Sequence, residues 1–211
     1  MSQDFWEENA SAWAEVIQGN TIASRAVTSG ALLKIISDKN IKSILDVGCG
    51  EGWLAGQLSP STVYLGIDGS ANLIAIAKEN HPSAFYCVSY SEISAGTWTA
   101  SDKYDAAIFN FSLLDEKITQ LLVNIQNSVS DNGLVIIQTL HPCFILESYK
   151  DGWNTEDYKA MAVPFSGTMP WYGRKLSSWM KCFSDAGLTL KEIVEPQTGD
   201  KPSSIIFILQ K

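Results

Sequence analysis

The chain has 211 residues, of which 45% are hydrophobic and 18% are charged, a composition typical of a globular protein and not of a disordered one. Its formal net charge of −8 would repel a polyphosphate, so a nucleic-acid partner is disfavoured. No apolar run approaches the length of a membrane-spanning helix, and no membrane association is expected.

Length and cysteine usage limit the organisation of the chain further. One domain with a well-buried core is expected at this length, and two of comparable size are not. The acidic start Met-Ser-Gln-Asp-Phe-Trp-Glu-Glu is unlike a secretory signal, which is basic and then apolar, so a cytoplasmic protein is expected. The four scattered cysteines form no Cys-x-x-Cys pair, so neither a metal site nor a disulfide framework is predicted.

Residues 1 to about 40 predict two helices. Aromatic and aliphatic residues recur there at helical spacing, and Gly19-Asn20 interrupts the pattern. We expect this segment to form a helical cap over the open face of a binding site.

The stretch from residue 43 to residue 58 predicts a strand, a glycine turn and a short helix. Residues 44–47 are apolar and mostly branched, and glycines follow at positions 48, 50 and 52. Glycine is needed where the backbone adopts a positive φ or where a ligand approaches the main chain closely. Three glycines within five residues therefore indicate a binding loop. Asp46 lies where a carboxylate can accept from turn amides or meet a positively charged ligand group.

Two large cofactor classes use such a loop. The dinucleotide fingerprint G-x-G-x-x-G would need its third glycine at Trp53, which is too bulky for close packing of helix and strand. Asp68 ends the second predicted strand at the distance expected of a ribose-binding acid, so Asp68 alone does not separate the two classes.

From residue 43 onward, short apolar runs alternate with helical patterns, as in a parallel sheet built from βαβ units. The predicted strands are 44–47, 63–67, 84–88, 105–110, 133–139, 188–194 and 204–209, and the predicted helices are 53–58, 71–80, 116–129 and 176–186. We expect an α/β fold with a doubly wound, mostly parallel seven-stranded sheet and helices on both faces. Ligands of such sheets bind at the carboxyl ends of the strands.

The segment Leu45-Asp46-Val47-Gly48-Cys49-Gly50-Glu51-Gly52 resembles the first motif of the class I S-adenosylmethionine-dependent methyltransferases, which is typically D-x-G-x-G-x-G. The resemblance implies a Rossmann-like three-layer fold, S-adenosylmethionine as the cofactor and S-adenosylhomocysteine as the product. In that family the loop backbone wraps the methionine part of the cofactor, and an acid after the second strand binds both ribose hydroxyls. The resemblance assigns cofactor contacts to Asp46, Gly48, Cys49, Gly50, Gly52, Asp68, Gly69 and Ser70.

The resemblance also implies contacts after the third and fourth strands. Where the family usually carries an acid that meets the adenine amino group, this chain has Tyr90, and Ser91 would supply the neighbouring amide. A phenol cannot accept from the amino group as a carboxylate does, so packing at a loop edge is an alternative role for Tyr90. Asn110 and Phe111 would lie beneath the methionine part of the cofactor.

In the same family the segment before the first motif often covers the site with an aromatic residue and sometimes with an arginine. Trp13 and Arg25 are the candidates here. Ordinary packing explains Trp13 equally well, and a solvated helix charge is an alternative explanation of Arg25.

Residues 141–175 predict a lid over the acceptor, because a connection of this length inside one domain is typical of a binding loop. A minor core or a dimer surface built from the aromatic rings of this segment is the alternative. His141 is a candidate catalytic base, because histidine side chains can accept a proton near neutral pH, and loop-holding hydrogen bonds are the alternative role. The His141-Pro142 and Trp171-Tyr172-Gly173-Arg174 patterns are similar to small-molecule methyltransferases of ubiquinone and biotin biosynthesis. His141, Trp171, Tyr172 and Arg174 are therefore the predicted substrate-binding residues.

The predicted protein is an enzyme that transfers a methyl group to a small-molecule acceptor, as a monomer or homodimer. Residues 1–40 would form the cap, 41–140 the cofactor-binding core, 141–175 the substrate lid and 176–211 a C-terminal helix with strands. A catalytically silent cofactor-binding or scaffold protein is an alternative, given the atypical Tyr90 region. A nicotinamide-dependent oxidoreductase and a protein methyltransferase are further alternatives.

Overall fold

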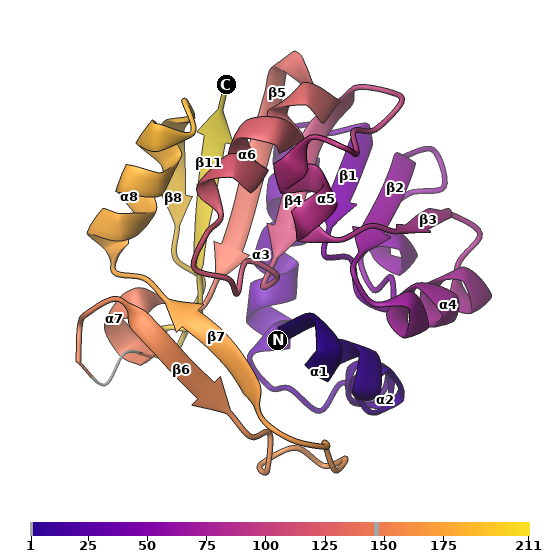
Figure 1. Cartoon of the computed structure of the whole chain (residues 1–211), viewed down its shortest axis with the longest axis vertical. Helices are drawn as coiled ribbons and strands as arrows, with labels where there is room; N and C mark the ends of the chain where they lie inside the picture. Colours follow the sequence, from indigo (N-terminus) through magenta and orange to yellow (C-terminus); the bar gives the residue numbers. More distant parts are fainter. Residues whose placement is uncertain (1, 146–147) are drawn as a thin grey trace.

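Seven strands form one sheet in the computed structural model, which describes residues 2–145 and 148–211. The strands are β1 (Ser43–Val47), β2 (Val63–Asp68), β3 (Ala84–Cys87), β4 (Tyr104–Asn110), β5 (Val129–Thr139), β8 (Thr189–Val194) and β11 (Ile205–Gln210). Their order is β3-β2-β1-β4-β5-β11-β8 (Figure 1). Each of the first five strands pairs in parallel with its neighbours among them, and β11 runs antiparallel to β5 and β8. The predicted mostly parallel seven-stranded sheet is confirmed.

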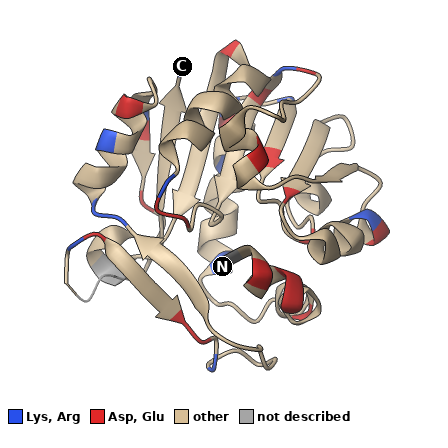
Figure 2. Ribbon diagram, viewed as in Figure 1, with Lys and Arg blue, Asp and Glu red and all other residues tan. Residues whose placement is uncertain are grey.

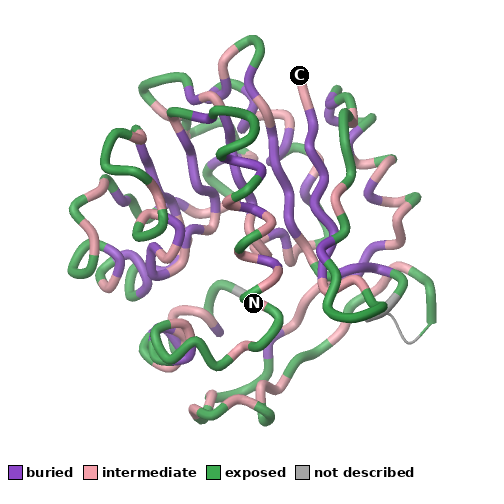
Figure 3. The backbone as a smooth tube through the Cα atoms, turned by 180° about the vertical axis from the view of Figure 1, so that it is seen from behind, coloured by how far each residue is buried: buried purple, intermediate pink, exposed green. Residues whose placement is uncertain are grey.

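Helices cover both faces of the sheet because consecutive strand residues point to opposite sides. Ile44 and Ile108 belong to one buried cluster, with residues of α3 (Arg25–Asp38) and α4 (Ala71–Asn80). Leu45 and Phe109 belong to the other. That second cluster includes residues of α5 (Tyr90–Ala95), α6 (Thr119–Ile125) and α8 (Leu176–Asp185). Figure 3 shows the buried residues concentrated along the central strands.

The strand order reverses between β1 and β4, which opens a crevice at the carboxyl ends of these two strands. Several segments gather at this end of the sheet in Figure 1. They are α1 (Ser2–Glu8), α2 (Ala10–Gln18) and a hairpin of β6 (Gly152–Glu156) and β7 (Met169–Gly173). The fold therefore places a roof of two separate segments over the position where ligands of doubly wound sheets bind.

Several elements differ from the sequence prediction. The N-terminal segment forms three helices, not two, and the predicted helix 53–58 is only a 3₁₀ turn, η1 (Ala55–Gln57). The predicted helix 116–129 is α6 followed by a 3₁₀ turn, η2 (Gln126–Ser128), and β5 begins at Val129, not at residue 133.

The segment after β3 is not among the predicted helices, and it forms α5. A capping box starts this helix: the Ser89 hydroxyl accepts from the Glu92 amide, and the Glu92 carboxylate accepts from the Ser89 amide. The Ser-x-x-Glu pattern that specifies this cap is present in the sequence.

The region predicted as an irregular lid contains regular structure. It holds the short helix α7 (Pro142–Ile145) and the antiparallel β6–β7 hairpin, in which Trp153 lies opposite Tyr172. Their rings form an edge-to-face pair with centroids 5.4 Å apart. A second small ribbon, of β9 (Gln197–Thr198) and β10 (Lys201–Pro202), follows β8.

Charged residues are distributed unevenly around this framework. Acidic residues mark α1 and α2 (Figure 2), where Asp4, Glu7, Glu8 and Glu15 occur without a lysine or arginine. Across the described chain, no helix is long and apolar enough to cross a membrane.

Candidate functional site

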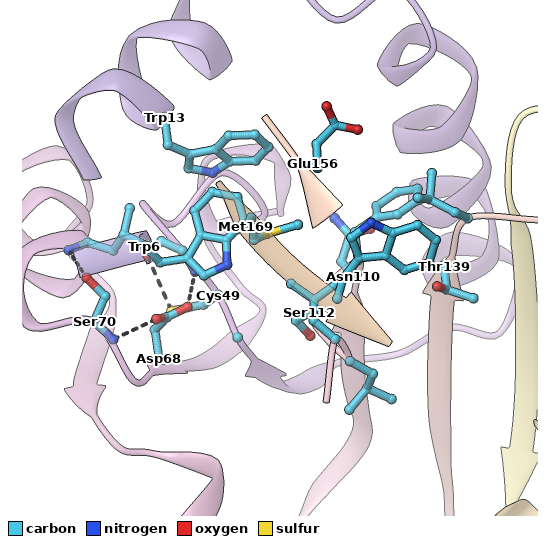
Figure 4. A pocket seen from close by; sticks show the side chains of 18 of the residues that line it. Trp6, Trp13, Cys49, Asp68, Ser70, Asn110, Ser112, Thr139, Glu156 and Met169 are labelled. Atoms are coloured by element: carbon cyan, nitrogen blue, oxygen red, sulfur yellow. Dashed lines mark hydrogen bonds between the residues drawn. The ribbon is translucent and has the colours of Figure 1, made fainter. Parts of the chain in front are cut away.

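A cavity of about 660 Å³ lies at the carboxyl ends of β1, β2 and β4, beneath the helical cap and the β6–β7 hairpin. Figure 4 shows the two indoles of Trp6 and Trp13 on one side of it, with Asp68 below Trp6 and Asn110 across the cavity. All of the site residues predicted from the sequence line this cavity except Gly52, Ser91 and His141.

The three loop glycines have different functions, although all adopt a positive φ. A Cβ added at Gly50 would have Trp13 Nε1, 3.8 Å away, as its nearest neighbour, so the main chain is open to the cavity at this position. A Cβ at Gly48 would lie 2.3 Å from Ser112 Cβ, and one at Gly52 would lie 2.9 Å from the His81 ring. Gly52 therefore permits close packing inside the protein, which corrects its predicted place among the cofactor contacts.

Asp68 is held at the end of β2 by the backbone of the loop it faces. Its two carboxylate oxygens accept from the Gly50 amide at 3.0 Å and from the Ser70 amide at 2.8 Å. A carboxylate offers about four lone-pair positions, so it retains acceptor capacity toward the cavity that it lines. Burial raises the pKa of Asp68, and the hydrogen bonds from Ser70 and Gly50 oppose that shift.

Two buried oxygens that belong to cavity-lining residues have no hydrogen-bond partner: Asp46 Oδ1 and Asn110 Oδ1. The other Asp46 oxygen accepts from the Tyr64 hydroxyl at 2.7 Å. Burial raises the pKa of Asp46 to about 7, which the Tyr64 hydrogen bond opposes and the neighbouring Asp68 and Glu51 carboxylates reinforce. Leaving a buried polar atom without a partner costs about 1–3 kcal/mol, so these two acceptors favour a ligand that brings donors or positive charge.

The ends of β4 and β3 complete this side of the cavity. Phe111, directly after β4, has a φ of 56°, which is rare for a bulky residue and indicates a strained turn. Tyr90 lines the cavity and donates from its hydroxyl to the Ser112 carbonyl at 3.1 Å. Ser91 is exposed and shares a hydrogen bond with Ser89, so the structure does not bring it to the cavity.

The N-terminal cap contributes more residues than the sequence predicted. Trp13 lines the cavity as expected, and Trp6 packs edge-to-face against it with ring centroids 5.0 Å apart. Gln3 donates to the Gly69 carbonyl at 2.7 Å, and Glu7 accepts from the Ser70 hydroxyl at 2.5 Å. Trp6 precedes Trp13 by seven residues, a helical spacing that could have identified both rings.

Arg25 and Glu51 bring charge to the same side of the cavity. Both residues line it, and the Arg25 guanidinium lies over the Trp53 ring, 4.8 Å from its centroid. Burial raises the pKa of Glu51, and the positive charge of Arg25 opposes that shift. Sequence reasoning missed Glu51 because it occupies a variable position of the glycine motif.

Cys49 fills space beside the loop. It is buried against the cavity, and burial raises the pKa of its thiol well above the ordinary value. A thiol held in its neutral form suits packing and not nucleophilic chemistry.

His141 does not line the cavity formed by the described residues, which corrects its predicted place at the reacting atoms. Its Nε2 lies 2.7 Å from a Glu195 carboxylate oxygen, and its Nδ1 accepts from the Cys143 amide at 3.3 Å. Nδ1 therefore bonds within the turn after β5, and Nε2 links this turn to Glu195 after β8, as the loop-holding alternative expects.

The predicted acceptor-side residues lie together at the end of β7. Trp171, Tyr172 and Arg174 line the cavity, as do Met169 and Tyr158, which the sequence did not single out. Arg174 is only 4% exposed, and its guanidinium lies 5.0 Å from the ring centroids of both Tyr172 and Trp179.

The cap and the hairpin region are joined directly. The Asn9 side chain donates to the Ser166 carbonyl at 3.0 Å and accepts from the Ser166 amide at 2.7 Å. Phe5 stacks on Tyr158 and Phe165, with centroid distances of 5.6 and 6.1 Å. The roof over the cavity is therefore one connected layer built from two distant parts of the sequence.

Comparison with known families and proteins identifies relatives of this arrangement. Residues 44–133 match a family model described as a methyltransferase domain. A malonyl-[acyl-carrier protein] O-methyltransferase from Halalkalibacterium halodurans is 28% identical over 109 residues, which are 48% of this chain and 40% of that protein. The chain thus spans less than half the length of this curated relative.

The similar solved structures cover more of this chain than the sequence match does. A putative S-adenosylmethionine-dependent methyltransferase from Listeria monocytogenes has a TM-score of 0.68 at 18% identity, covering 89% of this chain and 98% of that one. A complex described as DhpI-SAM-HEP has a TM-score of 0.70 at 15% identity, covering 99% and 95%. At these identities the likeness establishes the fold.

Proposed function

Because the chain carries a methyltransferase domain and has the fold of the class I S-adenosylmethionine-dependent methyltransferases, we propose that it transfers a methyl group from S-adenosylmethionine to a small organic acceptor. The malonyl-[acyl-carrier protein] O-methyltransferase relative supports methyl transfer as the reaction type.

The observation that carries the proposal is the juxtaposition of an open main chain and unpartnered acceptors in one cavity. Gly50 leaves the loop backbone accessible, and Asp68 lies 3.0 Å from the Gly50 amide with acceptor capacity to spare. Asp46 Oδ1 and Asn110 Oδ1 are buried acceptors without partners. A nucleoside with ribose hydroxyls and positive charge fits these groups.

Charge supports the same ligand. Asp46, Glu51 and Asp68 line the cavity, as does Arg25, whose positive charge acts on Glu51. A ligand that carries a sulfonium and an ammonium group would compensate the carboxylates, and its carboxylate would compensate Arg25. Asp68 would bind the ribose hydroxyls, and Asp46 and Asn110 would face the methionine part.

When bound, S-adenosylmethionine would supply a methyl group whose carbon is open to in-line attack by the acceptor's nucleophile, with the sulfonium sulfur as the leaving group. The chain's contribution is then to orient the two reactants and to exclude water. Trp6 and Trp13 cover one side of the cavity, and the β6–β7 hairpin covers another. His141 is engaged with Glu195 outside the cavity, so the proposal assigns it a positioning role in the turn after β5.

The acceptor we propose is a small molecule with apolar surface. Trp171, Tyr172, Tyr158 and Met169 give the acceptor side of the cavity aromatic and thioether contacts. A cavity of about 660 Å³ is within the range of small-ligand sites, and a roof that closes over it leaves little room for an extended polymer.

The test pairs two aspartates that make the same kind of backbone contact at opposite ends of the sheet. Asp68 accepts from two amides beside the cavity, and Asp105 accepts from the Lys42 and Ser43 amides at 2.8 and 2.9 Å, outside the cavity lining. We expect Asp68→Asn to weaken S-adenosylhomocysteine binding about 10- to 100-fold, since a hydrogen bond to a charged group contributes about 1.5–3 kcal/mol. Asp105→Asn should bind as the wild type does.

The same pair tests activity with labelled S-adenosylmethionine and the small-molecule fraction of a cell extract. Wild type and Asp105→Asn should transfer the labelled methyl group to a small product. Asp68→Asn should form no labelled product when the S-adenosylmethionine concentration is limiting. Cofactor binding without any labelled product would favour the silent binding protein. Equal cofactor affinity in the two variants would contradict the assigned ribose site.

A further inference from the structure

Arg174 presents a buried cationic nitrogen without a partner. The side chain is 4% exposed, it lines the cavity, and its Nη1 is one of the buried polar atoms that have no hydrogen-bond partner. Asp46 Oδ1 and Asn110 Oδ1 are the corresponding atoms elsewhere in the cavity lining, and both are acceptors. Arg174 Nη1 differs from them because it is a donor that carries positive charge.

The rest of the guanidinium is fixed by the protein. Nη2 donates to the backbone carbonyls of Asp115 and Glu116, with the Glu116 contact at 2.7 Å. The planar group lies between the Tyr172 and Trp179 rings, 5.0 Å from each centroid. These contacts hold the group in one orientation before any ligand binds, so little conformational entropy would be lost on binding.

None of the ion pairs found in the described chain includes Arg174. The Cys182 thiol, through a side-chain hydrogen bond, and the more distant Asp151 carboxylate favour the charged form of the guanidinium. The Asp151 carboxylate, which influences Arg174 from a distance, accepts instead from the Lys175 amide at 2.7 Å and the Ser178 hydroxyl at 2.5 Å. Burial of the guanidinium favours its neutral form, which lowers the pKa of Arg174, although arginine stays protonated at any physiological pH.

A purely structural role accounts for only part of this arrangement. The two hydrogen bonds of Nη2 hold the turn after β4 in place, and a neutral side chain could also donate them. This structural role does not require a full positive charge or a nitrogen without a partner. Burying an unpaired charge is costly, and an anion that binds in the cavity would offset that cost.

We propose that Arg174 is the anion-binding residue of the acceptor site, and that the acceptor is a small organic molecule carrying a carboxylate bound through Nη1. This inference rests on the proposed function, and it adds the chemical class of the acceptor. One free donor nitrogen suits a single carboxylate oxygen, because Nη2 is already engaged. The carboxylate anchors the molecule beside Trp171 and Tyr172, which contact its apolar part.

The experiment uses the full chain saturated with S-adenosylhomocysteine and a panel of acids with their isosteric amides. The probes are benzoate, phenylacetate, 3-phenylpropionate and indole-3-acetate, each paired with its primary amide, and binding is measured by ligand-observed NMR titration. At least one acid should bind about tenfold or more tightly than its amide. Equal binding of acid and amide in every pair would overturn the proposal without any variant being needed.

Variants test whether Arg174 causes the preference for acids over their amides. Arg174→Gln should reduce the acid-to-amide ratio to below about twofold, whereas Lys181→Gln, which removes an exposed cation of α8 outside the cavity lining, should leave the ratio unchanged. A preference that survives Arg174→Gln would refute the role of this residue. Urea unfolding of each variant verifies that it is folded, and Arg174→Lys, which keeps the charge but loses the fork, should retain part of the preference.

The two measurements distinguish failure of the carboxylate-bearing acceptor from failure of the proposed methyl transfer. Absence of S-adenosylhomocysteine binding would remove the proposed function as a whole. Normal S-adenosylhomocysteine binding with no acid preference would leave methyl transfer intact and refute only the carboxylate-bearing acceptor.

Discussion

Individual residues of the glycine loop show how much a sequence motif can specify. The motif predicted a backbone opened for a ligand, and Gly50 fulfils that role. It could not assign Gly52, whose missing side chain accommodates His81 and Phe85 from a different part of the chain. A glycine required by a ligand and a glycine required by the protein's own packing are identical in sequence.

The two glycines predict opposite phenotypes for the same substitution. Gly50→Ala places a methyl group in the cavity, so it should weaken S-adenosylhomocysteine binding at least about tenfold and cost about 1–2 kcal/mol of stability from its positive φ. Gly52→Ala adds clashes at 2.9–3.2 Å to the same backbone strain, so it should cost more stability while the folded protein binds nearly normally. Urea unfolding and calorimetry measure both effects, and the reverse ranking in either would contradict the assignment.

Asp46 predicts that cofactor binding depends on pH. Its pKa is raised from 3.8 to about 7, so the folded protein retains a proton that the unfolded chain releases, and this group's contribution to stability falls as pH rises from about 4 to about 7. A cationic ligand favours the ionised carboxylate and should expel that proton. S-adenosylmethionine affinity should therefore rise about tenfold between pH 6 and pH 8.

Calorimetry in buffers of different ionisation enthalpy would detect the released proton directly. Asp46→Asn should abolish the slope, which distinguishes Asp46 from Glu51 and Asp68, the other buried carboxyls with raised pKa values. An affinity that does not change with pH, or a slope retained in Asp46→Asn, would show that Asp46 does not face the cofactor's charge.

At the scale of elements, the cap helix α1 is attached to the cofactor side by few contacts. Glu7 accepts from the Ser70 hydroxyl at 2.5 Å and from the Asn72 amide at 3.2 Å, and both partners belong to the start of α4. Trp6 of α1 and Asp68 line the same side of the cavity (Figure 4), so a movement of α1 would widen access to Asp68. Elements that gate a site are typically held by a small number of exposed contacts of this kind.

We predict that Glu7→Ala speeds release of S-adenosylhomocysteine about fivefold, because it removes contacts worth about 1 kcal/mol from the closed cap. Glu8→Ala, an exposed position on the same helix with the same loss of charge, is the matched control and should leave release unchanged. Stopped-flow tryptophan fluorescence can follow the process through Trp6 and Trp13. Equal release rates in the two variants would contradict the gating role of α1.

Elements with strong periodicity were predicted well, and elements built by tertiary contacts were not. The strands and the helices α4 and α8 follow from hydrophobic patterns and glycine stops. The β6–β7 hairpin was missed because a lid region rich in aromatic residues has no clear alternation. The contact between cap and hairpin through Asn9 and Ser166 could not be predicted either, because no local sequence signal links residues so distant in the chain.

For the whole molecule, the order of strands determines where chemistry can occur. The reversal between β1 and β4 gathers the glycine loop, Asp68 and Asn110 at one edge, and this much was predictable because topology rules fix the location of the crevice. The acceptor side was less predictable. Arg174 was identified from its motif, but its unpartnered Nη1 emerges only from packing against Tyr172 and Trp179.

The identity of the cofactor is the claim on which the rest of the account depends. Isothermal titration calorimetry of the full chain, with S-adenosylhomocysteine and NADH titrated in parallel, tests it most directly. We predict saturable 1:1 binding of S-adenosylhomocysteine, weakened about 10- to 100-fold in Asp68→Asn, and no binding heat with NADH. Saturable binding of NADH with none of S-adenosylhomocysteine would contradict it.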